Sequence, residues 1–377
     1  MHGEKEWFHC GCGNTGGLNF TADMEIARTT DMANTDATTE AKPAPAVAAK
    51  RDKAWDFAKG ALVLCMVLYH SLNYLRHDRG GAALLYLRFL PPSFIFITGF
   101  LITHIYLARY RADDPRLQKR LLLRGAKLLA VFAVLNILVN VLMTRNFNGM
   151  NFGLGAFIDH LPEIFITGEG RHGIFLVLAP IAYLLMISGV LLLAHKFLKW
   201  SLHLVFIAAA VTELILDNNG YTIPNLRLLA AGLLGMVFGL SPADKIETVA
   251  RQWWLAIVVC AAYFLALNWW GDDTWLEYIG VCVMAGFFYS IGRLCGDGNF
   301  ASGTLALLGS YSLLAYISQI VVLQLLLRIF HRLNLERGVE WIGFFAATAL
   351  MIGLVHLTDW SRKKWPAADG AYRAVFA

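Results

Sequence analysis

The sequence predicts an all-α fold, a polytopic integral membrane helix bundle with about ten transmembrane helices. Aliphatic and aromatic residues make up 57% of the chain and charged residues only 16%, and its mean hydropathy is positive. Apolar runs close to the ~20 residues that cross a bilayer recur from residue 54 to residue 358. This composition excludes an ordinary soluble domain, so we expect bilayer lipid as a partner and no nucleic acid.

The spans follow from the positions of the apolar runs. In chain order we predict them at 54–75, 82–108, 121–143, 173–195, 198–216, 222–240, 253–270, 274–295, 303–328 and 339–358. Pro91 and Pro92 predict a kink or break in the second span. The stretch 146–172 mixes Gly, Phe and Ile with Asp159, His160, Glu163 and Glu169. We expect a loop, or a re-entrant or interfacial helix, rather than a full span there.

Basic residues indicate the orientation in the membrane. They gather before the first span, between the second and third, and after the last: Lys50, Arg51 and Lys53; Arg109, Arg111, Arg116, Lys119 and Arg120; Arg362, Lys363 and Lys364. With an even number of spans these clusters share one side, whereas the 271–277 loop is acidic. The positive-inside rule then predicts that both termini are cytoplasmic.

The two ends of the chain differ in kind from its centre. Residues 1–50 are rich in Thr, Ala, Asp and Glu without periodicity, which predicts a disordered cytoplasmic segment. Cys10 and Cys12 have no second pair at zinc spacing, so we predict no metal site. Residues 51–360 form the predicted transmembrane domain, and 361–377 a short cytoplasmic tail.

Three polar residues on the first span carry the functional argument. Lys59 and His70 are eleven residues apart, so they share one helix face and lie roughly 16 Å apart along it. Asp56 either caps this helix or pairs with Lys59 at i,i+3 and anchors it. Lys59 near the helix start can also form an anion site. His70 deep in the span indicates either function or a hydrogen bond to a neighbouring helix.

The third span begins with cations on a single face. Arg120, Arg124 and Lys127 recur at i, i+4 and i+7 as the helix enters the membrane. One interpretation is snorkelling toward lipid phosphates. The other is a phosphate clamp, because three cations on one face can hold a polyanion such as a nucleotide.

These motifs resemble the transmembrane acyltransferase superfamily, which includes acyltransferase-3 proteins, periplasmic-glucan succinyltransferases and heparan-glucosaminide N-acetyltransferases. The resemblance covers about residues 54–328. It is carried by Asp56-x-x-Lys59-Gly60 through His70, by Phe94-Ile-Phe-Ile-Thr-Gly99, by Arg124-x-x-Lys127 and by Leu308-Gly-Ser-Tyr-Ser312 through Tyr316. Lys59 and Lys127 replace the family's commoner arginines, and Ser318-Gln319 stands where many members have a histidine.

The resemblance implies an acyl-CoA donor, with acetyl-CoA or succinyl-CoA favoured, bound from the cytoplasmic side. It implies that Lys59, Arg120, Arg124 and Lys127 hold the donor phosphates, and that the Lys59–His70 spacing matches the reach of the pantetheine arm. His70 is then a general base or a transient acyl carrier, with direct base catalysis slightly favoured, and Asp56 is the second catalytic residue.

The acceptor implied by the resemblance is a hydroxyl or amine of a cell-envelope glycan on the far side. Ser71, Asn73 and Arg88 are candidate oxyanion donors. Four residues are candidates for binding the carbohydrate acceptor: Arg88, Glu169, Arg171 and His172. The implied location is a bacterial inner membrane, and a homodimer stays open.

Two other classes of function remain at this stage. A secondary transporter of a small polar or anionic solute also has about ten helices with polar groups inside them. It predicts charges near the midplane on several helices, whereas Glu213 and a few histidines are the main candidates here. A non-enzymatic scaffold does not need the spacing of Lys59 and His70.

Overall fold

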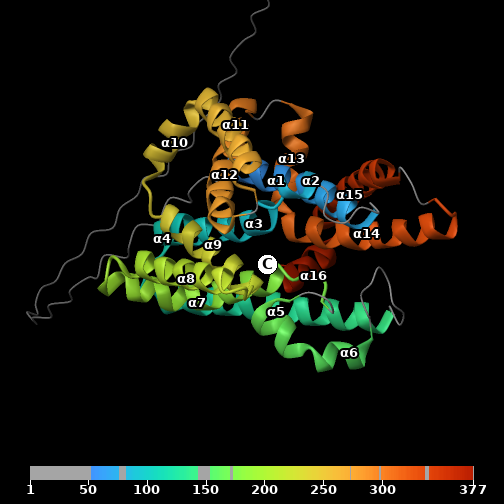
Figure 1. Cartoon of the computed structure of the whole chain (residues 1–377), viewed down its shortest axis with the longest axis horizontal. Coiled ribbons are helices and arrows are strands. Elements are labelled where there is room, and N and C mark those ends of the chain that lie inside the picture. The colour runs from blue at the N-terminus through green and yellow to red at the C-terminus, as the bar shows by residue number, and fades with distance from the viewer. Residues whose placement is uncertain are drawn as a thin grey trace, which may run out of the picture. The chain divides into compact units, whose positions relative to one another are not determined.

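The chain folds into helices throughout the part that the structure describes. The computed structural model describes residues 52–75, 82–142, 153–169, 173–271, 273–296, 299–335 and 339–376. Its first half contains α1 (Lys53–Leu75), α2 (Ala82–Leu85), α3 (Leu90–Leu101), the π-helical turn η1 (Ile102–Tyr106), α4 (Leu107–Arg109), α5 (Pro115–Leu142), α6 (Leu154–Asp159), the π-helical turn η2 (Glu163–Thr167) and α7 (Leu178–Phe197). Its second half contains α8 (Ser201–Asn218), α9 (Pro224–Phe238), α10 (Ala243–Arg251), α11 (Trp253–Trp270), α12 (Thr274–Cys295), α13 (Phe300–Ser310), α14 (Ser312–Arg332), α15 (Val339–Lys364) and α16 (Pro366–Phe376) (Figure 1).

The membrane-spanning helices agree with the predicted all-α bundle. Among the described residues, eight helices are long and apolar enough to cross a membrane, and nine if the bent pair of α9 and α10 is one span. α1 is not one of them, since it carries Lys59, His70 and Asn73. The predicted span 303–328 is in fact two helices, because the chain turns at Tyr311 between α13 and α14.

Side-chain contacts join the helix ends in two groups, as alternating spans require. Lys196 at the end of α7 lies 2.7 Å from the Asp113 carboxylate, just before α5. The Tyr289 hydroxyl near the end of α12 donates to Asp52 before α1 at 2.9 Å. At the other ends of the helices, the Thr274 hydroxyl donates to Asp217 at 2.6 Å. We call the first group the α1-start side and the second the far side.

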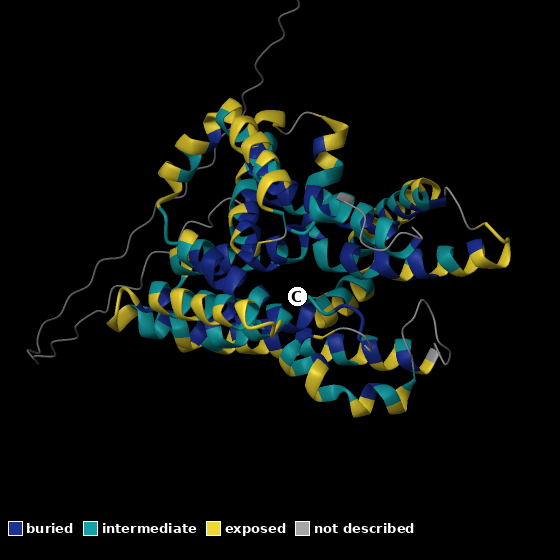
Figure 2. Cartoon of the chain, viewed as in Figure 1, coloured by how far each residue is buried: buried dark blue, intermediate teal, exposed yellow. Residues whose placement is uncertain are grey.

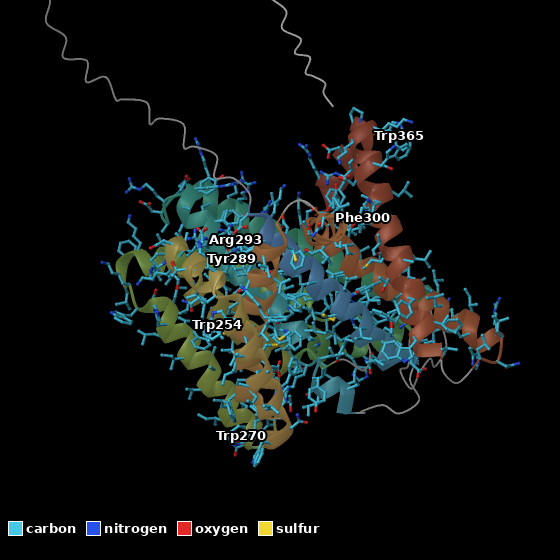
Figure 3. All side chains as sticks on the ribbon, turned by 90° about the horizontal axis from the view of Figure 1, so that it is seen from above. Trp254, Trp270, Tyr289, Arg293, Phe300 and Trp365 are labelled. Atoms are coloured by element: carbon cyan, nitrogen blue, oxygen red, sulfur yellow. The ribbon has the colours of Figure 1, made fainter. Side chains whose placement is uncertain are left out.

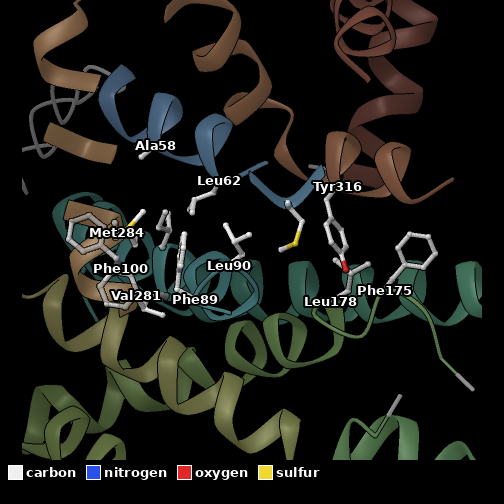
Figure 4. Packing of buried hydrophobic residues seen from close by; sticks show 14 of the residues in the cluster. Ala58, Leu62, Phe89, Leu90, Phe100, Phe175, Leu178, Val281, Met284 and Tyr316 are labelled. Carbon is white, nitrogen blue, oxygen red and sulfur yellow. The ribbon is translucent and has the colours of Figure 1, made fainter. Parts of the chain in front are cut away.

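α1 is largely buried although it carries charged and polar side chains. It packs against α3, α12, α13, α14 and α15, and most of its length is buried in Figure 2. Figure 4 shows Ala58 and Leu62 of α1 facing Phe100 of α3 and Met284 of α12. A helix that carries charge can lie in a membrane when it is surrounded by protein on all sides.

Asp56 is not the N-cap of α1, contrary to one of the two expectations for it. The helix begins one turn earlier, at Lys53, and Asp52 accepts a hydrogen bond from the backbone N–H of Ala54 at 2.9 Å. Asp52 therefore meets the cap geometry. Asp56 lies inside the first full turns, where its buried carboxylate pairs with Lys59.

The prolines of the second span stand at the start of a helix and do not bend one. Residues 86–89 form turns, and Pro91 and Pro92 stand in the first turn of α3. Proline is accepted there because the first N–H groups of a helix have no partner within the helix. The break therefore falls just before the prolines, and Phe89 and Leu90 fill the space beside it.

The described part of the stretch 146–172 is not a span, as predicted. It forms α6 and η2, and the Asn225 amide of α9 donates to the carbonyl oxygens of Phe165 and Ile166 at 3.0 and 3.2 Å. The Tyr183 hydroxyl of α7 donates to the same Phe165 carbonyl at 2.8 Å. These bonds satisfy irregular backbone that lipid could not.

Two glycines let α1 and α13 approach until their backbones touch. A Cβ at Gly60 would overlap the carbonyl oxygen of Leu305, and a Cβ at Gly309 would overlap that of Asp56. The contact includes the backbone that carries Asp56 and Lys59. Small residues at such crossings are typical of helix packing in membranes.

We predict that Gly309→Ala destabilises the bundle, because neither backbone can move aside without parting α1 from α13. The cost should be about 1–3 kcal/mol or more, measured as a lower midpoint of thermal denaturation in detergent. Gly303→Ala on the same helix is the matched control, since a Cβ there meets no atom within 4 Å. Equal midpoints for the two variants would contradict the close crossing.

Candidate functional site

A basic cavity of about 370 Å³ lies on the α1-start side of the bundle. Its charged lining comes from two helices, with Lys59 from α1 and Arg124 and Lys127 from α5. The remaining lining residues are Thr98, Leu101, Ile102, Tyr106, Leu128, Leu185, Ser310, Ser312, Leu313, Tyr372, Val375 and Phe376. The structure thus brings together three of the four cations predicted to bind one polyanion.

The cations of the basic cavity are held by neighbours of their own. Lys59 lies 2.7 Å from the Asp56 carboxylate, and both side chains are largely buried. The Arg124 guanidinium donates to the Tyr106 hydroxyl and lies over that ring. Tyr106 ends η1, a π-helical turn of the kind often found at functional sites. The three cations give the cavity a basic lining, in which Lys59 is already paired with Asp56.

Arg120 lies outside this group. Its side chain is exposed and donates to the Tyr110 hydroxyl at 2.9 Å, and it does not line the basic cavity. It stands one helical turn before Arg124, toward the helix end that begins at Pro115. In this conformation Arg120 contributes charge at the outer rim and makes no contact with the cavity wall.

The wall opposite α5 is α16, which the sequence did not predict. Residues 361–377 were expected to form a short tail, whereas Pro366–Phe376 is a helix that places Tyr372, Val375 and Phe376 in the cavity lining. The amphipathic spacing of these residues on one face was the signal that could have indicated it.

Arg362 holds α16 in this position. Its guanidinium donates to the Asp369 carboxylate at 2.7 and 2.9 Å and to the Tyr311 hydroxyl at 2.9 Å. It also lies 4.0 Å from the centre of the Tyr372 ring. Arg362 therefore connects α15 and α16 to the turn between α13 and α14, where Ser310 and Ser312 line the cavity.

His70 lies farther along α1, in a cluster of aromatic side chains formed by Tyr69, Tyr74 and Tyr316, which we call the aromatic cluster. Its ring centre is 5.3 Å from those of Tyr69 and Tyr74 and 6.4 Å from that of Tyr316. Both ring nitrogens are buried and have no hydrogen-bond partner among the described residues. The expected alternative, a hydrogen bond from His70 to a neighbouring helix, is therefore not what holds this side chain.

Other buried polar atoms on α1 and α14 share this property. The Ser71 hydroxyl and both amide atoms of Gln319 are buried without a partner in the described part of the chain. Gln319 follows Tyr316 by one turn on α14. Buried polar groups are rarely left unpaired in folded proteins, and the atoms on α1 and α14 are one set among several in the described residues, others being on His195, His203 and Tyr263.

Phe175 packs against the aromatic cluster in an unusual backbone conformation. Its φ is +63° although it carries a large buried side chain, and its ring meets that of Tyr316 edge-on at 6.2 Å. Figure 4 shows Tyr316 directed toward Phe175 and Leu178. Such strain costs free energy, and it persists where surrounding structure imposes it, often at functional sites.

α14 contributes to both sites, since Ser312 and Leu313 line the basic cavity and Tyr316 lies beside His70. The Tyr316 ring lies 6.4 Å from that of Phe94 on α3, and Thr98 one turn along α3 lines the cavity. Along the continuous helix α1, Lys59 and His70 are roughly 16 Å apart. By the same rise Asp56 is roughly 21 Å from His70, so it positions Lys59 and does not contact the imidazole.

Arg88 belongs to a buried charge network on the far side. It lies 2.9 Å from the Glu277 carboxylate, which is also 3.8 Å from Arg227. Arg227 in turn pairs with Glu213 at 2.7 Å and with Asp217 at 3.1 Å. Of these residues the sequence singled out Arg88 and Glu213. It did not indicate that the five residues form one network, because they come from four separate segments of the chain.

The other predicted acceptor-side residues lie apart from this network or outside the described residues. Glu169 is exposed, and its backbone N–H donates to Thr167. His160 pairs with Glu163 at 2.9 Å at the surface. Arg171 and His172 fall outside the described residues, as do Cys10 and Cys12. In the described ranges no three His, Cys, Asp or Glu side chains gather as metal ligands.

The fold and these two sites define a class of protein, a multi-pass membrane protein with a basic cavity and a buried histidine along the same helix, α1. An acyltransferase domain of the acyltransferase-3 family matches residues 52–360. The chain belongs to that family and is a membrane acyltransferase that transfers groups other than aminoacyl groups. Comparison with curated proteins and with solved structures gives no match.

We predict that Arg362→Leu frees α16 from the cavity, because it removes the contacts to Asp369, Tyr311 and Tyr372 together. Hydrogen exchange across residues 366–376 should then increase at pH 7. Arg373→Leu is the control, since Arg373 is mostly exposed and pairs only with the other Asp369 oxygen.

The pH dependence of this contact has a definite sign. The hydrogen bond from Arg362 lowers the pKa of Asp369 below its ordinary value of 3.8. Its contribution is therefore complete above that value and is lost as the pH falls through the lowered pKa. Protection of α16, corrected for intrinsic exchange, should stay constant from pH 7 to about 5. A loss of protection in that window would contradict the role of the Arg362–Asp369 ion pair in holding α16.

Proposed function

We propose that the protein transfers an acyl group, acetyl or succinyl, from cytoplasmic acyl-CoA to a hydroxyl or amine of a cell-envelope glycan on the far side. The observation that carries this proposal is the gathering of Lys59, Arg124 and Lys127 around one cavity, with His70 farther along the same helix. The location that fits is a bacterial inner membrane, with both termini cytoplasmic as the basic clusters predict.

The basic cavity suits the phosphates of the donor. Three cations face it from α1 and α5, and hydrogen bonds to charged groups there are stronger than neutral ones. The distance of roughly 16 Å from Lys59 to His70 is comparable to the reach of a pantetheine arm from its phosphates to its thioester. A donor held by its phosphates therefore brings the thioester toward His70.

His70 supplies the proton chemistry in this proposal. In the direct route a neutral ring nitrogen takes the proton of the acceptor hydroxyl as that oxygen attacks the thioester carbonyl. The carbon–sulfur bond breaks, and the imidazolium returns the proton to the leaving thiolate. In the alternative route the ring nitrogen itself attacks the thioester, the carbon–sulfur bond breaks and CoA leaves as the thiolate. The acceptor hydroxyl then attacks the acyl-imidazole, the carbon–nitrogen bond breaks, and the acceptor proton passes to the released imidazole. We favour the direct route slightly.

Groups beside His70 can stabilise the developing oxyanion. Ser71 is its neighbour on α1, and its buried hydroxyl is unpaired among the described residues. The Gln319 amide on α14 is a second donor that the sequence did not predict as such. Asn73 stays a candidate, whereas Arg88 is paired with Glu277 and is better suited to ordering the acceptor end.

The acceptor enters from the far side in this scheme. Arg88 would act there within its network, together with Glu169, Arg171 and His172. Asp56 keeps a role in the reaction as the residue that orients Lys59.

We predict that His70→Ala lowers acyl transfer by about 10²- to 10⁴-fold, the usual contribution of a general base. Transfer from radiolabelled acetyl- or succinyl-CoA measures it, with insertion and thermal midpoint as checks of folding. His104→Ala is the matched control, because His104 stacks on Phe100 and belongs neither to the lining of the basic cavity nor to the aromatic cluster. Full activity in the His70 variant would falsify both routes.

We predict that Arg124→Ala and Lys127→Ala each raise the KM for acyl-CoA by at least about tenfold, from the loss of a charged hydrogen bond. The kcat should change much less, since the phosphates are remote from the reacting atoms. Arg120→Ala on the same helix is the comparison, with a smaller effect because Arg120 does not line the cavity. A loss confined to kcat in either cavity variant would contradict phosphate binding.

A further inference from the structure

A second cavity, also lined in part by α1, differs from the first in character. Its volume is about 450 Å³, and it shares no lining residue with the basic cavity. Trp55, Phe96 and Phe100 line it from α1 and α3, Val259 from α11 and Phe287 from α12. We call it the apolar cleft.

The apolar cleft borders the surface that faces lipid. Val259 of α11 lines it and is 41% exposed, and Ile257 and Val258 on the same helix are exposed as well. In a membrane that surface contacts hydrocarbon rather than water. A cleft of apolar side chains that borders it is filled favourably by a hydrocarbon chain and unfavourably by water.

One side of the apolar cleft is formed by α10, which has the features of an interfacial helix. α10 turns away from α9 by 100°, so it cannot continue through the bilayer. It directs Ile246 and Ala250 into the cleft, while Thr248 and Arg251 are exposed. The exposed Trp253 and Trp254 follow at the start of α11, and Figure 3 shows Trp254 and Trp270 at separate ends of that helix. Amphipathic helices and tryptophans of this kind mark the headgroup level.

The rim of the cleft carries positive charge at that level. Lys245 on α10 lines the cleft and is exposed, and its ammonium group makes no ion pair within the described ranges. Arg251 and Arg293 both pair with Glu247 beside it. Lys245 is therefore the one charged residue among the described residues that line the cleft.

We propose that the apolar cleft binds one acyl chain of an anionic phospholipid and that Lys245 binds its headgroup phosphate. An apolar interior with a cationic rim at headgroup level matches the chemistry of such a lipid, and basic pockets between transmembrane helices bind anionic headgroups elsewhere. The bound chain would support Trp55, which stacks on Tyr289 at 4.4 Å and precedes Lys59 by one turn of α1.

Gly286 on α12 offers a direct test. It lines the apolar cleft, and a Cβ there meets no atom within 4 Å, so Gly286→Phe can fill the cleft without displacing the backbone. Gly353→Phe on α15 is the matched control, because Gly353 is equally open and does not line the cleft. Thermal midpoints of both variants check that the bundle folds.

The measurement is native mass spectrometry of protein released from vesicles of equal parts phosphatidylglycerol and phosphatidylcholine. We expect wild type and Gly353→Phe to retain phosphatidylglycerol, and Gly286→Phe to lose it by about tenfold or more, in line with a bound group displaced at a cost near 1.4 kcal/mol. Lys245→Gln should retain lipid without preference between headgroups. Equal retention by Gly286→Phe and wild type, or a bound fatty acid in place of phospholipid, would overturn the proposal.

Discussion

The burial of a polar helix among apolar ones is the constraint on which the rest of this structure depends. α1 carries a lysine, an aspartate and a histidine into a membrane, where unpaired charge is costly. Five helices surround it, and the glycine crossing with α13 brings backbone against backbone. The surrounding protein lets Lys59 pair with Asp56 away from lipid and keeps both nitrogens of His70 enclosed.

The same helix carries two different environments along its length. At its start, cations from α1 and α5 face a cavity that the amphipathic α16 closes from one side. Farther along, aromatic rings enclose His70, and electrostatic interactions there are strong because water is largely excluded. α14 contributes to both regions, with Ser312 and Leu313 in the cavity lining and Tyr316 beside His70.

Much of this site could be predicted from residue spacing within single helices. The 3.6-residue period places Lys59 and His70 on one face, and Arg124 and Lys127 on another, whatever the rest of the chain does. That period also includes Arg120, although in the structure Arg120 bonds to Tyr110 at the rim. Periodicity reports which residues share a face, but not how far along the helix the cavity extends.

Hydropathy and helical period in the sequence determine the all-α bundle, most of its spans and the placing of the cations and the histidine along them. They act locally, over about twenty residues at a time. The tertiary structure alone decided which segments meet: α16 beside the basic cavity, Phe175 against Tyr316, and Arg227 between three carboxylates. It also moved the N-cap of α1 to Asp52 and divided the ninth predicted span at Tyr311. The contacts between these segments depend on residues distant in the chain, which no local pattern encodes.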